Sequence, residues 1–151
     1  DIFDLSWKNL LDAYSCTECG RCSAACPANI TGKLLSPRKI MMDTRDRLEA
    51  VGKNITANKQ FIPDGKQLLN DYITTEELRA CTTCNACVQE CPVSISPLDI
   101  ILQLRRCLVM EESNSPPEWT AMFSNVENNF APWKFSPEER DAWATEMKIE
   151  H

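Results

Sequence analysis

The chain has 151 residues, 43% of them hydrophobic and 7% aromatic, and a formal net charge of −6. This size suits one small domain with a further segment, and the acidic balance argues against non-specific binding to nucleic acid, which requires a basic surface. Because no apolar run approaches the roughly 20 residues of a membrane-spanning helix, we expect none. The start lacks the basic and apolar regions of a signal peptide. It also lacks Met, which indicates processing or a piece of a longer protein.

The first predicted element is a short helix over residues 6–14, which leads into a run of cysteines. The run reads C-x2-C-x2-C-x3-C-P and contains Cys16, Cys19, Cys22 and Cys26. This pattern is typical of a bacterial ferredoxin loop for a [4Fe–4S] cluster. Three thiolates wrap one face of the cluster, the fourth points away, and the proline turns the chain off the loop.

An amphipathic helix is predicted next, with Ser36 as its N-cap and Pro37 at its first position. Its apolar face is marked by Ile40, Met41, Thr44 and Leu48. Gly52 is predicted to end this helix. The following segment, residues 53–71, is predicted to be a loop with a short helix near residues 66–69.

Basic residues gather along this part of the chain, at Lys33, Arg38, Lys39, Arg45 and Arg47. The ordinary interpretation is a solvated helix face. The alternative is a docking patch for an acidic redox partner.

The second half of the chain repeats the first. A short helix over residues 74–80 begins with the capping-box spacing of Thr74 and Glu77. The same cysteine pattern follows, at Cys81, Cys84, Cys87 and Cys91. Another amphipathic helix then begins with Ser96 as N-cap and Pro97 at its first position. Its apolar face is marked by Leu98, Ile101, Leu104 and Leu108.

The repeat predicts how the cysteines are shared between two clusters. In two-cluster proteins the fourth cysteine of each run ligates the other cluster. We therefore assign the first cluster to Cys16, Cys19, Cys22 and Cys91, and the second to Cys81, Cys84, Cys87 and Cys26. Two structural zinc sites are the alternative, although zinc modules usually offer paired C-x2-C knuckles without a third cysteine. Disulfides fit such closely spaced cysteines poorly.

The ninth cysteine, Cys107, lies among apolar residues of the last predicted helix of the repeat. We interpret it as a buried, inert small hydrophobe, with a redox-sensing or catalytic thiol as the minority interpretation.

After residue 112 the composition changes, and no further cysteine occurs. One helix is predicted to start in the segment Ser115-Pro116-Pro117-Glu118 and to run to about Asn128, and a last one starts at Ser136. Five aromatic residues of this tail need a surface to cover: Trp119, Phe123, Phe130, Trp133 and Trp143. We therefore predict a two-cluster domain over residues 1–112 and a helical tail over 113–151. The tail would pack on the cluster domain or contact a further domain.

No useful strand-period alternation occurs, so the predicted fold is all-α. Two such cysteine runs among helices resemble the α-helical ferredoxin fold. Residues 14–22, 35–40 and 80–87 resemble the membrane-associated iron–sulfur oxidoreductases related to heterodisulfide reductase, including its C-type component. The segment 128–133 is similar to the one that precedes the Cys-Cys-Gly-type domain of that family.

The resemblance implies an electron-transfer module with two [4Fe–4S] clusters inside a larger oxidoreductase, not catalytic on its own. It also implies partner domains or subunits: a membrane haem or quinone part, a Cys-Cys-Gly-type domain or an electron-transfer flavoprotein. The whole protein would then lie in the cytoplasm at the inner face of the membrane. A zinc-binding interaction module without redox activity is the alternative function.

Overall fold

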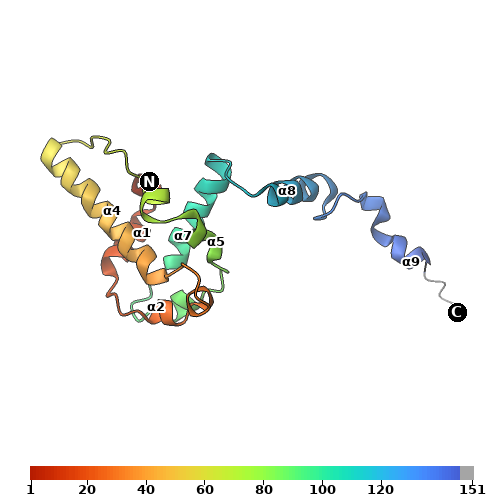
Figure 1. The fold of residues 1–151 in the computed structure, drawn as a ribbon, viewed down its shortest axis with the longest axis horizontal. Helices are drawn as coiled ribbons and strands as arrows, with labels where there is room; N and C mark the ends of the chain where they lie inside the picture. The colour runs from red at the N-terminus through yellow and green to blue at the C-terminus, as the bar shows by residue number, and fades with distance from the viewer. Residues whose placement is uncertain (147–151) are drawn as a thin grey trace. The chain divides into compact units, whose positions relative to one another are not determined.

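The structure, a computed structural model, describes residues 1–146 and is built from helices (Figure 1). Within those residues there is no β-strand, only an isolated bridge between Leu69 and Ile73. The all-α prediction is therefore confirmed. The elements, in chain order, are η1 Ile2–Asp4, α1 Trp7–Ser15, α2 Arg21–Ala24, α3 Pro27–Ile30, α4 Pro37–Asn58, η2 Leu68–Tyr72, α5 Thr75–Ala80, α6 Ala86–Gln89, α7 Pro97–Arg106, η3 Cys107–Glu111, α8 Pro117–Asn129, η4 Pro137–Asp141 and α9 Ala142–Glu146.

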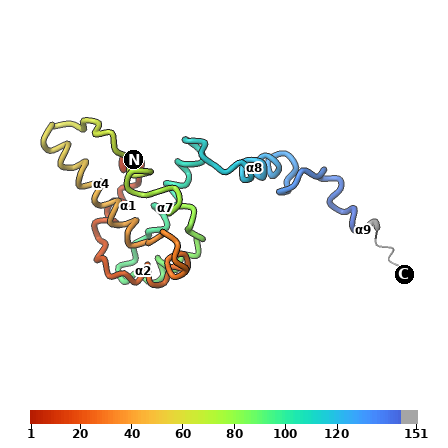
Figure 2. Tube along the Cα trace, viewed as in Figure 1, coloured from red at the N-terminus to blue at the C-terminus, as the bar shows by residue number. Residues whose placement is uncertain are grey.

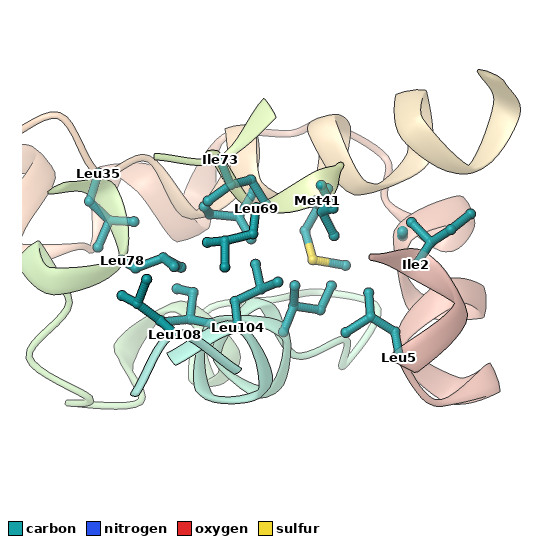
Figure 3. Packing of buried hydrophobic residues seen from close by; sticks show 14 of the residues in the cluster. Ile2, Leu5, Leu35, Met41, Leu69, Ile73, Leu78, Leu104 and Leu108 are labelled. Atoms are coloured by element: carbon teal, nitrogen blue, oxygen red, sulfur yellow. The ribbon is translucent and has the colours of Figure 1, made fainter. Parts of the chain in front are cut away.

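The chain divides into two units, Asp1–Glu112 and Ser113–His151. In the first unit α4 packs against both α1 and α7, and α5 packs against α7. Apolar side chains from these helices meet in one core, in which Leu69 lies between Leu78 and Met41 (Figure 3). Burying such side chains is the main driving force for this packing. Cys26 belongs to this core, and Cys16, Cys81 and Cys91 pack against it.

Serine and threonine caps begin the main helices where the sequence predicts. The hydroxyl of Ser36 accepts a hydrogen bond from the backbone N–H of Lys39, and Pro37 occupies the first position of α4. Ser96 caps α7 in the same way. Thr74 forms the predicted capping box with Glu77. These caps satisfy N–H groups that have no partner inside a helix, and the three predictions are confirmed.

The prediction that Gly52 ends its helix is wrong, because α4 continues to Asn58. A glycine inside a helix costs only about 1 kcal/mol relative to alanine. The extension is held by Val51, which is buried. It is also held by Asn54, whose side-chain amide donates to the carbonyl of Ile62 and accepts from the backbone N–H of the same residue.

The loop between the halves is correspondingly shorter than predicted and spans residues 59–67. The helical piece expected near residues 66–69 is instead the turn η2, in which Leu69 and Asn70 have non-helical backbone angles. Leu68 and Leu69 are buried in the core. A turn that buries two leucines therefore stands where a short helix is predicted.

One residue of the predicted basic cluster is not on the surface at all. The side chain of Arg47 is fully buried and pairs with Asp1 at 2.7 Å and Asp64 at 2.6 Å. It also donates to the backbone carbonyl of Lys66. Hydrogen bonds from Arg47, together with the backbone N–H of Lys66, lower the pKa of Asp64 to about 2. Arg47 thus ties α4 to the chain start and to the loop before η2, and neither interpretation of the basic cluster predicted this.

The second unit is described from Ser113 to Glu146. α8 begins at Pro117 and ends where Phe130 adopts a positive φ of 56°, close to the predicted bounds. Trp119, Phe123 and Val126 recur at helical spacing on α8 and are all substantially exposed. No helix in residues 1–146 combines the length and the apolar character needed to cross a bilayer.

We predict that Arg47→Met lowers the stability of the first unit by about 3 kcal/mol, because two carboxylates and a carbonyl lose their shared partner. The thermal unfolding midpoint of anaerobic, cluster-loaded protein, followed by circular dichroism, measures the change. Lys53→Met on the exposed side of the same helix is the control and should shift the midpoint little. Equal effects of the two substitutions would contradict the structural role of Arg47.

Candidate metal centre

Both cysteine runs follow the same backbone path. α1 ends at Ser15, immediately before the first run, and α5 ends at Ala80, immediately before the second. Each run then forms a loop and a one-turn helix, α2 in the first and α6 in the second. These two short helices contact each other, and Figure 2 shows the red-orange trace of the first run beside the green trace of the second. The internal repeat of the sequence is therefore also a repeat in space.

Two residues in each loop have left-handed backbone conformations. They are Glu18 and Gly20 in the first loop and Thr83 and Asn85 in the second, with φ between 56° and 81°. Glycine and asparagine adopt such angles readily, but a β-branched threonine rarely does. These turns aim backbone N–H groups inward. The N–H of Thr83, for example, lies 3.4 Å from the Sγ atom of Cys81.

Eight cysteines surround two small cavities. Site A is the cavity lined by Cys16, Cys19, Cys22 and Cys91. Site B is the cavity lined by Cys26, Cys81, Cys84 and Cys87. Each site thus combines three cysteines of one run with the last cysteine of the other run. The structure brings together the same two sets of four residues that the sequence groups as ligands.

The two cavities are of similar size, about 340 and 310 Å³ when the solvent at their mouths is counted. A single zinc ion needs four sulfur atoms at about 2.3 Å from one point. Among residues 1–146, no three His, Cys, Asp or Glu side chains are placed to hold one metal ion. Four cysteines line each of the two spaces, and a [4Fe–4S] cluster is held by such a set of four thiolates.

Hydrogen-bond donors at the exposed cysteines stabilise their thiolate forms. The backbone N–H of Arg21 lowers the pKa of Cys19, and the backbone N–H of Ala86 lowers the pKa of Cys84. A threonine hydroxyl two residues before each cysteine acts in the same direction. Thiolates are the form that binds iron. The two loops therefore supply equivalent donors at equivalent places.

The pKa values of two more buried cysteines shift in the opposite direction. Burial raises the pKa of Cys22. Burial, followed by the negative charges of Cys81, Cys22 and Cys26, raises the pKa of Cys87 to about 11. Cys22 belongs to site A, and its influence on Cys87 of site B indicates that the two sites are close neighbours. A bound metal offsets this cost, because coordination deprotonates a thiol outright.

Apolar side chains of the following helices form the inner walls of both sites. Met41 of α4 and Ile95 line site A. Leu35, Leu98 and Ile101 line site B. Residues of the two predicted apolar faces, Met41 on α4 and Leu98 and Ile101 on α7, thus lie against the cysteines.

Most of the predicted basic cluster is used within the molecule. Lys39 hydrogen-bonds to Asp43 at 2.7 Å and to Glu77 at 2.8 Å. Arg45 forms an ion pair with Glu18 in the first cysteine loop. A solvated helix face therefore describes these residues incompletely, since they bind α4 to α5 and to the loop.

Arg105 is a structural residue whose role the sequence did not reveal. Its Nε donates to the carbonyl of Leu78 at 2.9 Å, and its guanidinium also donates to the carbonyl of Cys81. It thus holds the end of α5 at the first cysteine of the second run. Arg45 stands at the same distance after the Ser-Pro cap of its own helix and holds the first loop through Glu18. The equivalent positions of Arg45 and Arg105 in the repeat are the sequence signal that could have revealed this role.

Cys107 lies outside both sites and is half-buried, so the prediction of a buried thiol is only partly right. Its Sγ atom is 3.6 Å from a carboxylate oxygen of Glu111. Burial and the negative charge of Glu111 raise the pKa of this thiol, which disfavours the reactive thiolate.

Comparisons with known proteins agree with this geometry. Residues 15–95 match the family described as 4Fe–4S dicluster domain. The chain is 34% identical to the probable iron–sulfur-binding oxidoreductase FadF of Bacillus subtilis, over 96% of this chain and 25% of that protein. It is 33% identical to the EtfAB:quinone oxidoreductase of Syntrophomonas wolfei, over 99% of this chain and 24% of that protein.

The chain is also 37% identical to the C-type component of the ferredoxin/F420H2-dependent CoB–CoM heterodisulfide reductase of Methanosarcina acetivorans, over 67% of this chain and 49% of that protein. The chain spans about a quarter of the length of the first two relatives. The resemblance to heterodisulfide-reductase-related oxidoreductases is thus confirmed. The chain belongs to the 4Fe–4S dicluster domain family and carries two [4Fe–4S] clusters.

Proposed function

We propose that this chain is an electron relay that passes electrons between its two clusters inside a larger oxidoreductase. The observation that carries the proposal is the pair of adjacent cavities, each lined by four cysteines drawn from both runs. A [4Fe–4S] cluster takes up and releases single electrons, and its potential is set by charge, burial and hydrogen bonds to its sulfur atoms. Two such groups held close together form a short path from one partner to another.

In this proposal site A holds its cluster through Cys16, Cys19, Cys22 and Cys91, and site B through Cys26, Cys81, Cys84 and Cys87. The shared ligands make the two runs interdependent, because each cluster closes a loop between the halves of the chain. The protein otherwise supplies backbone N–H donors, apolar walls and a rigid frame. None of these groups performs bond-making chemistry, so the domain serves an enzyme and is not a complete one.

The names of two relatives support a proposal about the partners. One relative is named as an EtfAB:quinone oxidoreductase and another as a component of a heterodisulfide reductase. We propose that the full protein takes electrons from a flavoprotein partner and delivers them to a quinone or a membrane haem part. A Cys-Cys-Gly-type domain is the alternative acceptor, with a disulfide as substrate. The exposed aromatic residues of α8, among them Trp119 and Phe123, would contact such a further domain.

A quinone acceptor resides in the membrane, and exposed cluster thiolates are best protected in a reducing compartment. We therefore place the full protein in the cytoplasm, attached to the inner face of the membrane through partner segments.

The first prediction concerns the clusters themselves. Anaerobically purified chain is expected to be brown, to contain about eight irons, and to lose visible absorbance on addition of dithionite. Absorbance spectra before and after reduction, with iron and zinc assayed on the same sample, make the measurement. A colourless protein with about two zinc ions would require the electron-transfer proposal to be withdrawn in favour of a structural zinc module.

The second prediction concerns the shared ligands. Cys91→Ala should abolish the cluster of site A and leave about four irons per chain. Adding Cys19→Ala, which affects the same site, should cause no further loss. Adding Cys84→Ala, which affects site B, should remove the remaining iron. Iron content after anaerobic reconstitution, with circular dichroism to check the fold, measures each variant.

Cys107→Ala is the matched control and should keep about eight irons, because Cys107 lies outside both sites. If the two double variants behave in the opposite way, each run ligates its own cluster and the shared scheme is refuted.

A further inference from the structure

The two sites lie at equivalent places in the repeat but differ in charge. Counted from the caps Ser36 and Ser96, Arg38 on α4 corresponds to Leu98 on α7. Arg38 lines site A and Leu98 lines site B. The same helix position therefore offers a cation to one cluster and an aliphatic side chain to the other.

The charge of Arg38 is available to site A. Its guanidinium approaches the first cysteine loop, and one terminal nitrogen is 3.9 Å from where a Cβ atom would lie on Gly20. No Asp or Glu in the part of the chain that the structure describes forms an ion pair with Arg38. Glu18 also lines site A, but Arg45 pairs with its carboxylate. Apart from its cysteines, the wall of this cavity therefore carries one cation, Arg38, that forms no ion pair within the described residues.

Site B lacks a comparable cation in its wall. Apart from its cysteines, the residues that line it carry no ionisable group. Arg105 lies nearby, but its guanidinium is turned to the carbonyls of Leu78 and Cys81 at the end of α5. These carbonyls carry the negative end of the helix dipole and offset part of its charge.

Two further differences act in the same direction. Ser23, which follows Cys22 of site A, carries a hydroxyl, whereas the equivalent residue of the second run is the apolar Val88. Cys26 and Cys87 of site B are buried, while all four cysteines of site A are half-buried or exposed. Reduction adds one negative charge to a cluster. Nearby cations, sulfur hydrogen bonds and solvent favour the reduced form, whereas an apolar, buried site disfavours it.

From these differences we infer that the cluster of site A has a higher reduction potential than the cluster of site B. This inference rests on the proposed relay and adds a direction to it. One electron leaves the reduced [4Fe–4S]⁺ cluster of site B, which becomes [4Fe–4S]²⁺, and enters the oxidised [4Fe–4S]²⁺ cluster of site A, which becomes [4Fe–4S]⁺. No proton or bond is exchanged. Site B is the entry side of the relay and site A the exit side.

The test exchanges the two equivalent residues. Redox titrations of the cluster-loaded chain, followed by EPR, should resolve two midpoint potentials. Arg38→Leu should move the higher potential downward and leave the lower one nearly unchanged. Leu98→Arg should move the lower potential upward and leave the higher one nearly unchanged. Lys53→Leu removes an exposed cation far along α4 and should move neither.

The inference is overturned if Arg38→Leu moves the lower potential, if Leu98→Arg moves the higher one, or if neither substitution moves either. A chain that takes up no iron would instead defeat the proposed relay itself, so the two failures are distinguishable. Because the substitutions act at separate sites, a folding defect in one variant leaves the other as an independent test.

Discussion

The structure depends on the meeting of its two cysteine runs. Neither run can complete its cavity alone, since Cys91 comes from the second run into site A and Cys26 from the first into site B. Segments far apart in the sequence must therefore lie side by side before either site exists. The buried thiol of Cys87 loses solvation when it enters site B, and burial raises its pKa. Packing of the helices has to hold the runs together against that cost.

The helices that follow the runs provide this support. α4 and α7 contact each other and place apolar residues such as Met41 and Ile101 against the sites. Arg45 and Arg105 hold the cysteine loops from equivalent positions, but one binds a carboxylate and the other binds backbone carbonyls. A duplicated frame thus carries two sites with different surroundings. That combination suits a relay, because equal geometry keeps the clusters close while unequal charge separates their potentials.

The second unit has a different physical character. Trp119, Phe123 and Val126 present an apolar stripe on α8, and each remains exposed. Scattered exposed apolar residues are normal on a protein surface, but several on one helix face indicate a contact surface. This observation supports the proposal that the chain works with further protein parts, since it spans about a quarter of the length of its first two relatives.

The sequence by itself determined the cluster type, the eight candidate ligands and the beginnings of the main helices. Spacing decides these features locally: three cysteines two residues apart form one loop, and Ser36-Pro37 or Ser96-Pro97 caps one helix turn. The end of α4 could not be determined in this way. Gly52 is a weak stop, and the contacts of Val51 and Asn54 with distant residues outweigh it.

Only the tertiary structure decided which charges reach the clusters. In the sequence Arg38, Arg45 and Arg47 form one basic group, but in the fold they face a cluster cavity, a loop carboxylate and a buried pair of aspartates. Helical periodicity predicts that these three side chains point in different directions. It does not predict their partners, because those partners come from elsewhere in the chain. Electrostatic surroundings are set by neighbours in space, so the order of the two potentials became readable only once the halves were packed together.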